Sequence, residues 1–238
     1  ENAVKNIGKL PNLDLVGIQE LNSDVDKSIM KVQENLDKFE RGKTGLATVS
    51  ILWNSDIFGK VKYKKVFNLF DGDSRPCLIL IMENNFILVN MHFPWSIRKH
   101  IALKNLKNGI NKDKRLRKAF YDNDDAKIIM LGDFNDNNTT ITKNKPLVLK
   151  SSSSSKQTIR LRHIKTREQA RKTMRSCCWH KPKHKYKYFS DTGDYILVNK
   201  NIKQTAIGIP SIFKVRGRNN RLFSDHMPVM AKLNIGEN

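Results

Sequence analysis

Four short polar clusters hold the residue types needed for phosphate chemistry, and each follows or ends an apolar run. They are DLVGIQE at Asp14–Glu20, VNMHF at Val89–Phe93, IIMLGDFND at Ile128–Asp136 and FSDHMPV at Phe223–Val229. Carboxylates, amides and imidazoles hold hard divalent cations and phosphates. Polar side chains at the end of a buried strand are poorly suited to a core. We therefore expect the clusters to converge on one site and the chain to be an enzyme.

The spacing within two clusters predicts which side chains share a face. With the period of two of a strand, Asp133 and Asn135 point to one side, and Phe134 points away to pack. Asn90 and His92 have the same two-residue spacing at the end of an apolar strand. A single histidine there is more often a structural residue than a catalytic one, so the argument depends on several clusters together.

Alternating apolar runs and helical or looped connections predict an α/β protein that places these clusters. The expected helices are Asp24–Phe39 and Arg98–Phe120. The expected strands are Asp14–Ile18, Ala47–Trp53, Cys77–Met82, Phe86–Met91, Lys127–Leu131, Asp194–Val198 and Met227–Leu233.

The net charge of +21 indicates a polyanionic partner, with nucleic acid the first choice and an anionic membrane surface the second. Lys150–Lys187 has 13 Lys and Arg residues against one acid, Glu168, and so supplies +12 of this charge. It opens with Ser151–Ser155, which reads as a flexible linker. The following stretch, from Ile159 to Arg175, has the composition of a basic helix.

Basic residues interleaved with aromatic ones in this segment suit contact with phosphates and stacking on bases. A disordered charged loop or a nuclear-localisation signal are the alternatives. The residues expected to bind nucleic acid are Asn90, Arg175, Trp179, Lys181, Lys183, Lys185 and Lys187.

Composition also bears on the compartment. Three cysteines, two of them the adjacent Cys177 and Cys178, fit a reducing compartment better than a disulfide framework. No apolar run approaches the roughly 18–20 residues needed to span a bilayer, and Glu1–Lys9 shows no secretory signal. We expect an intracellular protein, nuclear or cytoplasmic, without membrane insertion; secretion stays open if the N-terminus was processed.

The order of QE, N-x-H, GDFN, GDYIL and SDH resembles the endonuclease/exonuclease/phosphatase superfamily, which includes DNase I, exonuclease III-type endonucleases and the nuclease subunit of cytolethal distending toxin. The resemblance covers most of the chain, from about Leu13 to Leu233. It implies a DNase I-like, four-layered α/β/β/α sandwich as a single domain over residues 1–238, with 150–187 as a basic insertion. It also implies a divalent metal, Mg²⁺ or Mn²⁺ in its place, and hydrolysis of phosphate esters.

The resemblance assigns the carboxylates and one amide. Glu20 is similar to the metal-binding glutamate that closes the QE motif, and Asp225 to the aspartate near the metal. Asp133 and Asn135 resemble the pair that positions the attacking water and the scissile phosphate. Asp194 resembles the acid that orients a catalytic histidine.

The resemblance assigns the histidines too and shows two departures. His226 is similar to the catalytic imidazole, and His92 to the second histidine, which contacts or protonates phosphate oxygens. The family's first strand carries an asparagine before the QE motif, and no such strand is expected in the 19 residues before Glu20. DNase I-like members support the histidine that corresponds to His92 with a glutamate, where this chain has Arg75.

The function expected is a metal-dependent nuclease, with DNA as the first expected substrate and RNA as the second. The sequence leaves two alternatives open. One is a catalytically impaired member that binds nucleic acid without cutting it. The other is a phosphoesterase acting on phospholipid, sphingomyelin or inositol phosphates. Oligomeric state is not predicted.

Overall fold

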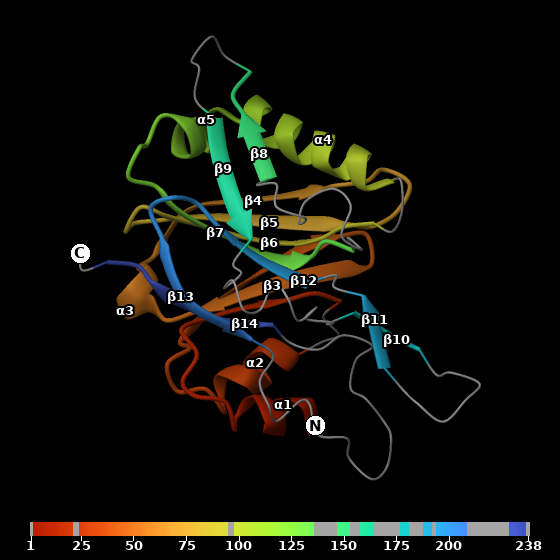
Figure 1. Ribbon diagram of the computed structural model, residues 1–238, viewed down its shortest axis with the longest axis vertical. Coiled ribbons are helices and arrows are strands. Elements are labelled where there is room, and N and C mark those ends of the chain that lie inside the picture. Colours follow the sequence, from red (N-terminus) through yellow and green to blue (C-terminus); the bar gives the residue numbers. More distant parts are fainter. Residues whose placement is uncertain are drawn as a thin grey trace.

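The computed structural model describes most of the chain, with the helices and strands labelled in Figure 1. The described residues are 2–20, 24–94, 98–135, 147–152, 158–163, 177–180, 188–191, 194–208 and 229–236. Within these ranges, no helix is long and apolar enough to cross a bilayer.

The larger sheet has seven strands in the order β4-β5-β6-β7-β12-β9-β8. Neighbouring strands are antiparallel except β6 and β7, which are parallel. A parallel pair needs a crossover connection, which here contains two helices, α4 (Arg98–Lys112) and α5 (Lys114–Tyr121). The strands are β4 Val61–Asn68, β5 Pro76–Met82, β6 Phe86–His92, β7 Lys127–Asp133, β8 Leu147–Lys150, β9 Thr158–His163 and β12 Asp194–Val198.

A smaller antiparallel sheet has the order β1-β3-β2. Its strands are β1 Leu15–Ile18, β2 Lys38–Thr44 and β3 Ala47–Trp53. Two further antiparallel pairs are β10 with β11 and β13 with β14. Their bounds are β10 Cys177–His180, β11 Tyr188–Asp191, β13 Lys203–Gly208 and β14 Met230–Asn234. The remaining helices are α1 Asn2–Ile7, α2 Val25–Met30 and α3 Ser55–Phe58.

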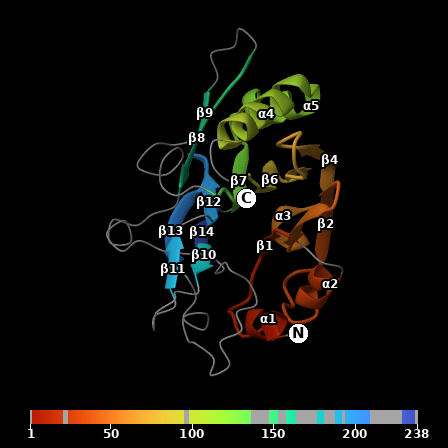
Figure 2. The ribbon, with the colours of Figure 1, turned by 90° about the vertical axis from the view of Figure 1, so that its right-hand side faces the viewer.

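Three buried apolar clusters separate four layers. The first joins α4 and α5 to the large sheet, the second joins the two sheets, and the third joins the small sheet to α1 and α2. Figure 1 shows α4 and α5 in green and α1 and α2 in red at opposite ends of this stack, and Figure 2 shows the same order from the side. The predicted α/β/β/α sandwich is therefore confirmed.

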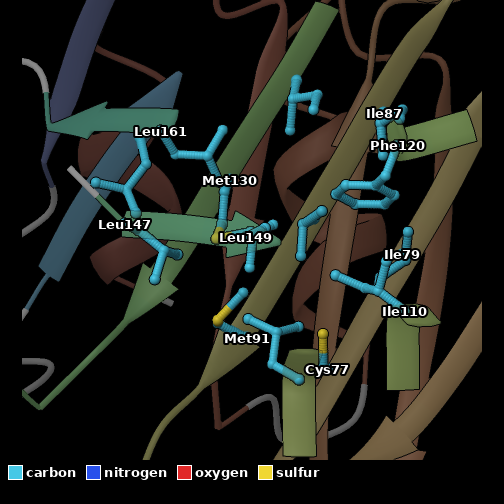
Figure 3. Close-up of a cluster of buried hydrophobic side chains, with 14 of the residues drawn as sticks. Cys77, Ile79, Ile87, Met91, Ile110, Phe120, Met130, Leu147, Leu149 and Leu161 are labelled. Atoms are coloured by element: carbon cyan, nitrogen blue, oxygen red, sulfur yellow. The ribbon is translucent and has the colours of Figure 1, made fainter. Parts of the chain in front are cut away.

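Alternation along β6 decides what each of its faces carries. Ile87, Val89 and Met91 belong to the cluster under α4 and α5, shown in Figure 3. Phe86 and Leu88 belong to the cluster between the sheets. Asn90 and His92 continue that second series, so they lie on the side of the smaller sheet, at one edge of the stack.

Neither expected helix is continuous over its predicted range. Asp113 interrupts the predicted helix over Arg98–Phe120, because its backbone is extended and its carboxylate accepts from the amides of Arg115 and Leu116. It therefore begins a new helix as an N-cap. The helix predicted over Asp24–Phe39 is confined to α2, and the chain from Lys38 pairs with β3 over seven residues. Pairing with the sheet here outweighs local helix preference.

The basic segment is partly built into the large sheet. The predicted basic helix from Ile159 is wrong at its start, because Thr158–His163 forms β9 between β12 and β8. Leu161 is buried in the core while Arg160 and Arg162 are exposed. This alternation has the period of a strand. The rest of the predicted helix, residues 164–175, lies outside the described residues.

The Asp113 cap gives a stability prediction. Burial raises the pKa of this carboxyl, but hydrogen bonds from the Tyr63 hydroxyl and the Leu116 amide, with Lys65 close by, outweigh it and lower the pKa to about 2. Asp113→Ala should lower the free energy of unfolding at pH 7 by about 1 kcal/mol. The part due to the charge is present above the ordinary pKa near 3.8 and is lost as the pH falls towards 2.

Urea unfolding of both proteins at pH 7 and below pH 3 measures this difference. We expect the gap between wild type and variant to narrow at the lower pH. A gap of unchanged size would show that the Asp113 charge contributes nothing to stability.

Candidate active site

Three of the predicted residues form a row across neighbouring strands. His92, at the end of β6, is the register partner of Asp133, at the end of β7. Asp133 is in turn the register partner of Asp194, at the start of β12. Strand alternation places all three on the side that faces the smaller sheet, because Leu131 and Ile196 pack between the sheets. The sheet thus brings together residues far apart in the sequence.

The buried imidazole of His92 lies close to two carboxylates. The His92 side chain is 4% exposed, and its Nε2 lies 3.6 Å from Asp133 Oδ2 and 3.8 Å from Glu20 Oε1. Glu20 follows β1 of the smaller sheet and has a left-handed φ of 53°. Its side chain is 73% exposed. The imidazole of β6, the carboxylate of β7 and the Glu20 carboxylate, which follows β1, therefore meet at this edge.

Asn90 fixes the chain just before Glu20. It is fully buried, its Nδ2 donates to Ile18 O at 2.9 Å and to Ser50 O at 2.7 Å, and its Oδ1 accepts from Gln19 Nε2 at 2.5 Å. These bonds join the two sheets next to the QE pair. The structure therefore does not support the expected direct contact of Asn90 with nucleic acid, because the side chain is enclosed and bonds to Ile18 and Gln19, just before Glu20.

The GDFN turn has a different geometry from the one predicted. Asn135 lies beyond the end of β7 with φ 46°, so strand alternation does not relate it to Asp133. Instead, Asp133 Oδ1 accepts from the Asn135 backbone amide at 2.8 Å. Phe134 packs against Phe93 and Tyr195, as predicted. Gly132 has φ 152°, and a Cβ there would lie 2.2 Å from Met91 O, so the turn requires glycine.

One acceptor in this turn has no hydrogen-bond partner among the described residues. Asn135 Nδ2 donates to Phe93 O at 2.6 Å, but Asn135 Oδ1 is buried and unpaired. Buried acceptors in proteins are nearly always satisfied. An unpaired oxygen on a residue whose backbone amide bonds to Asp133 indicates a place for a water molecule.

Arg75 supports His92 where the resemblance predicts a glutamate. Its Nη1 lies 2.7 Å from His92 Nε2 and 3.3 Å from Nδ1. Its Nε and Nη2 lie 2.9 and 2.8 Å from Asp73 Oδ2. A guanidinium has only donors, so the ring nitrogen is the acceptor in this arrangement. Its position just before β5 was visible in the sequence, but its contact with His92 was not.

Several predicted residues lie outside the described residues. Asp225 and His226 fall in 209–228, and Arg175 in 164–176. For Trp179 the backbone is described, as part of β10, but not the side chain. Lys181, Lys183, Lys185 and Lys187 fall in 181–187. Their roles stay predictions.

The oxygen donors present suit a hard cation. Within the described ranges, no group of three or more His, Cys, Asp or Glu side chains is arranged to hold a metal ion. Glu20 nevertheless supplies an exposed carboxylate, and the Asp133 carboxylate lies close to the same His92 nitrogen. Mg²⁺ takes few protein ligands and keeps several waters, so this donor set fits it. Before β1 the described chain forms α1.

Comparisons with known proteins agree with this arrangement. The model of the endonuclease/exonuclease/phosphatase family matches residues 2–226. A search of curated proteins finds no match. Among solved structures, ANGEL2, a 2′,3′-cyclic phosphatase, is similar with a TM-score of 0.66 and 16% identity, over 98% of this chain and 84% of that one.

Two further solved structures share the fold. TDP2 of D. rerio, in complex with a single-strand DNA product, has a TM-score of 0.60 and 15% identity, over 93% of this chain and 86% of that one. A mannosyl-6-phosphatase of Bacteroides thetaiotaomicron has a TM-score of 0.61 and 15% identity, over 93% and 85%. At these identities the likeness concerns the fold, and it confirms the DNase I-like arrangement.

Proposed function

This chain belongs to the endonuclease/exonuclease/phosphatase family, and we propose that it is a divalent-metal-dependent phosphodiesterase that hydrolyses the backbone of nucleic acid, with DNA as the first expected substrate and RNA as the second. The observation that carries the proposal is the row of His92, Asp133 and Asp194 in register across three strands. The unpaired Asn135 oxygen beside this row supports it. Members of this family are phosphoesterases, and the strong positive charge favours a polyanionic substrate.

The residues divide the reaction between them. Asn135 Oδ1 accepts a hydrogen bond from the attacking water and orients it towards phosphorus. The water oxygen forms the new bond as the bond to the leaving oxygen breaks. The proton of the water is taken either by Asp133 or by His226, which Asp194 would orient. The group that takes this proton then gives it to the leaving oxygen.

Charge on the phosphate is balanced by neighbouring groups. His92 and Arg75, which contact each other, would lie beside the non-bridging oxygens, and the Arg75 guanidinium would provide N–H donors to them. Glu20, with Asp225, would hold Mg²⁺. When bound, this ion neutralises charge that develops on the phosphate oxygens.

A substrate panel tests the proposal. It contains supercoiled plasmid, single-stranded DNA, abasic duplex and RNA, each with Mg²⁺ and with EDTA, and separate assays of sphingomyelin and inositol phosphates. We expect cleavage of at least one nucleic acid with Mg²⁺ and none with EDTA. Binding without cleavage would indicate the impaired member, and release of phosphate or phosphocholine from the lipid and inositol substrates alone would replace the nuclease proposal.

The basic segment gives a further prediction. Neutralising Lys181, Lys183, Lys185 and Lys187 to Gln should weaken DNA binding and reduce the slope of log affinity against log salt. Each phosphate contact that is removed should reduce the magnitude of this slope by about 0.9 on a duplex. Fluorescence anisotropy in EDTA over a series of salt concentrations measures the slope.

A matched control separates contact from bulk charge. Lys9, Lys31, Lys38 and Lys60 are exposed and lie outside the basic segment. Their change to Gln removes the same charge and should alter the slope less. Equal slopes for the two variants would mean that the segment makes no specific phosphate contacts.

A further inference from the structure

The positive charge of this protein is concentrated in two segments. Residues 98–121, which form α4 and α5, contain nine Lys and Arg residues and one acid, Asp113. Together with Lys150–Lys187 they supply +20 of the net +21, so the other 176 residues are almost neutral. A protein that used lysines only for solvation would distribute them over its surface. The charge on α4 and α5 therefore needs its own explanation.

The one acid of the helical pair does not neutralise this surface. Asp113 caps α5, and its carboxylate also contacts the Tyr63 hydroxyl and Lys65 of β4. Its side chain is only 12% exposed. The basic side chains on the outer side of the pair are exposed, and they are Lys104, Lys112, Lys114, Arg115 and Lys118.

The position of α4 relates this surface to the active site. Asn105 donates to Leu69 O, beyond the end of β4 that lies near His92, and Asp113 lies at Tyr63, towards the other end of β4. Helix α4 thus runs along the sheet away from the edge that carries His92 and Asp133, called the catalytic edge below. Its 15 residues span about 22 Å. Beyond it, Lys62, Arg115 and Lys118 line a hollow beside the turn between β5 and β6.

The apolar face of the pair is already used. Leu106, Ile110, Leu116 and Phe120 are buried against the large sheet. Of the described side chains on the outer face, only Ile101 is a large exposed hydrophobic residue. Helices that lie in a membrane surface bury an apolar face in the lipid, which this pair does not offer. A linear array of phosphates fits the surface better.

We propose that the outer surface of α4 and α5 is a second binding surface for nucleic acid, which holds the phosphate backbone as it leaves the catalytic edge. The inference rests on the proposed function only for the identity of the polyanion, because binding does not require cleavage. Its residues are distinct from those of the site, so it affects affinity for long substrates and not the chemical step.

The test compares Lys104, Lys112, Lys114 and Lys118 changed together to Gln with the control at Lys9, Lys31, Lys38 and Lys60. Anisotropy in EDTA is measured with duplexes from about 6 to about 30 base pairs, which span roughly 20 to 100 Å at ~3.4 Å per pair. Wild-type affinity should rise with length over this range. In the variant with the four lysines of α4 and α5 changed, called the helix variant, affinity for the longest duplex should be roughly tenfold lower than in wild type. The rise of affinity with length is then reduced, and the salt slope should fall by about 3. The control variant should change the length dependence and the salt slope less than the helix variant does.

Two results would overturn the inference. One is an equal dependence on length for the helix variant and the control variant. The other is binding to phosphatidylserine vesicles that is stronger than binding to DNA and is lost in the helix variant while DNA binding is kept. Unchanged thermal unfolding of each variant shows that the fold is intact. Binding is measured in EDTA, where no cleavage is expected, so it is independent of the cleavage assays with Mg²⁺. A protein that binds in this way but cuts no nucleic acid with Mg²⁺ would refute the proposed function and leave this inference standing.

Discussion

Asp133→Asn is expected to lower turnover by roughly 10²-fold or more, the scale for losing a general base or a charge at the reacting phosphate. The substitution keeps the size of the side chain, and the amide oxygen still accepts from the Asn135 backbone N–H, as Oδ1 does now. What is lost is the negative charge 3.6 Å from His92 Nε2. The fold should therefore remain while the chemistry fails.

Asp125→Asn is the matched control. Asp125 is exposed in the turn before β7, at the opposite end of that strand from Asp133. Steady-state cleavage of the best substrate in the panel, with thermal unfolding of each protein, measures both effects. Turnover of Asp133→Asn close to that of wild type would remove this carboxylate from the mechanism.

Asn90→Ala is expected to be among the most destabilising single changes in this protein. It leaves Ile18 O and Ser50 O without their donor and Gln19 Nε2 without its acceptor, at the junction of the two sheets. Buried groups left unsatisfied in this way cost about 2–4 kcal/mol in total. For a chain of this length that corresponds to a fall in Tm of about 5–15 °C.

The same change should also weaken the metal site, because Asn90 fixes the chain that leads to Glu20. Mg²⁺ affinity, measured by titration of activity and by the Mg²⁺-dependent rise in Tm, should fall. Asn108→Ala, on the exposed face of α4, removes an asparagine without such contacts and should change neither quantity. A variant at Asn90 with wild-type stability and wild-type Mg²⁺ dependence would show that the cross-sheet bonds have no such role.

The sequence was sufficient for the strands that carry the site. In the apolar run Ile128–Leu131, the first three residues are buried and Leu131 is partly buried, and polar residues follow at its end as predicted. Strand alternation correctly placed Asn90 and His92 on one face, because both lie inside β6. It failed for Asn135, because the chain leaves the strand at Asp133 and turns with a positive φ.

Other features depend on contacts that no local pattern contains. The enclosure of Asn90 results from β1 and β3 packing on β6, which brings Ile18 and Ser50 to it from distant parts of the sequence. Arg75 meets His92 only because β5 and β6 are neighbours. By contrast, the strand at Thr158–His163 had a readable signal, since Ile159 and Leu161 alternate with two arginines, but its basic composition favoured a helix.

The central claim is that Glu20, His92, Asp133 and Asn135 form one site that holds a cation and a phosphate. Its most direct test is a crystal structure with Mn²⁺ and a nucleotide product, with the metal located by anomalous scattering. The account predicts an anomalous peak in contact with the Glu20 carboxylate and a phosphate within hydrogen-bond distance of His92. A metal and a phosphate bound elsewhere, with these four side chains untouched in crystals that still cleave substrate, would contradict it.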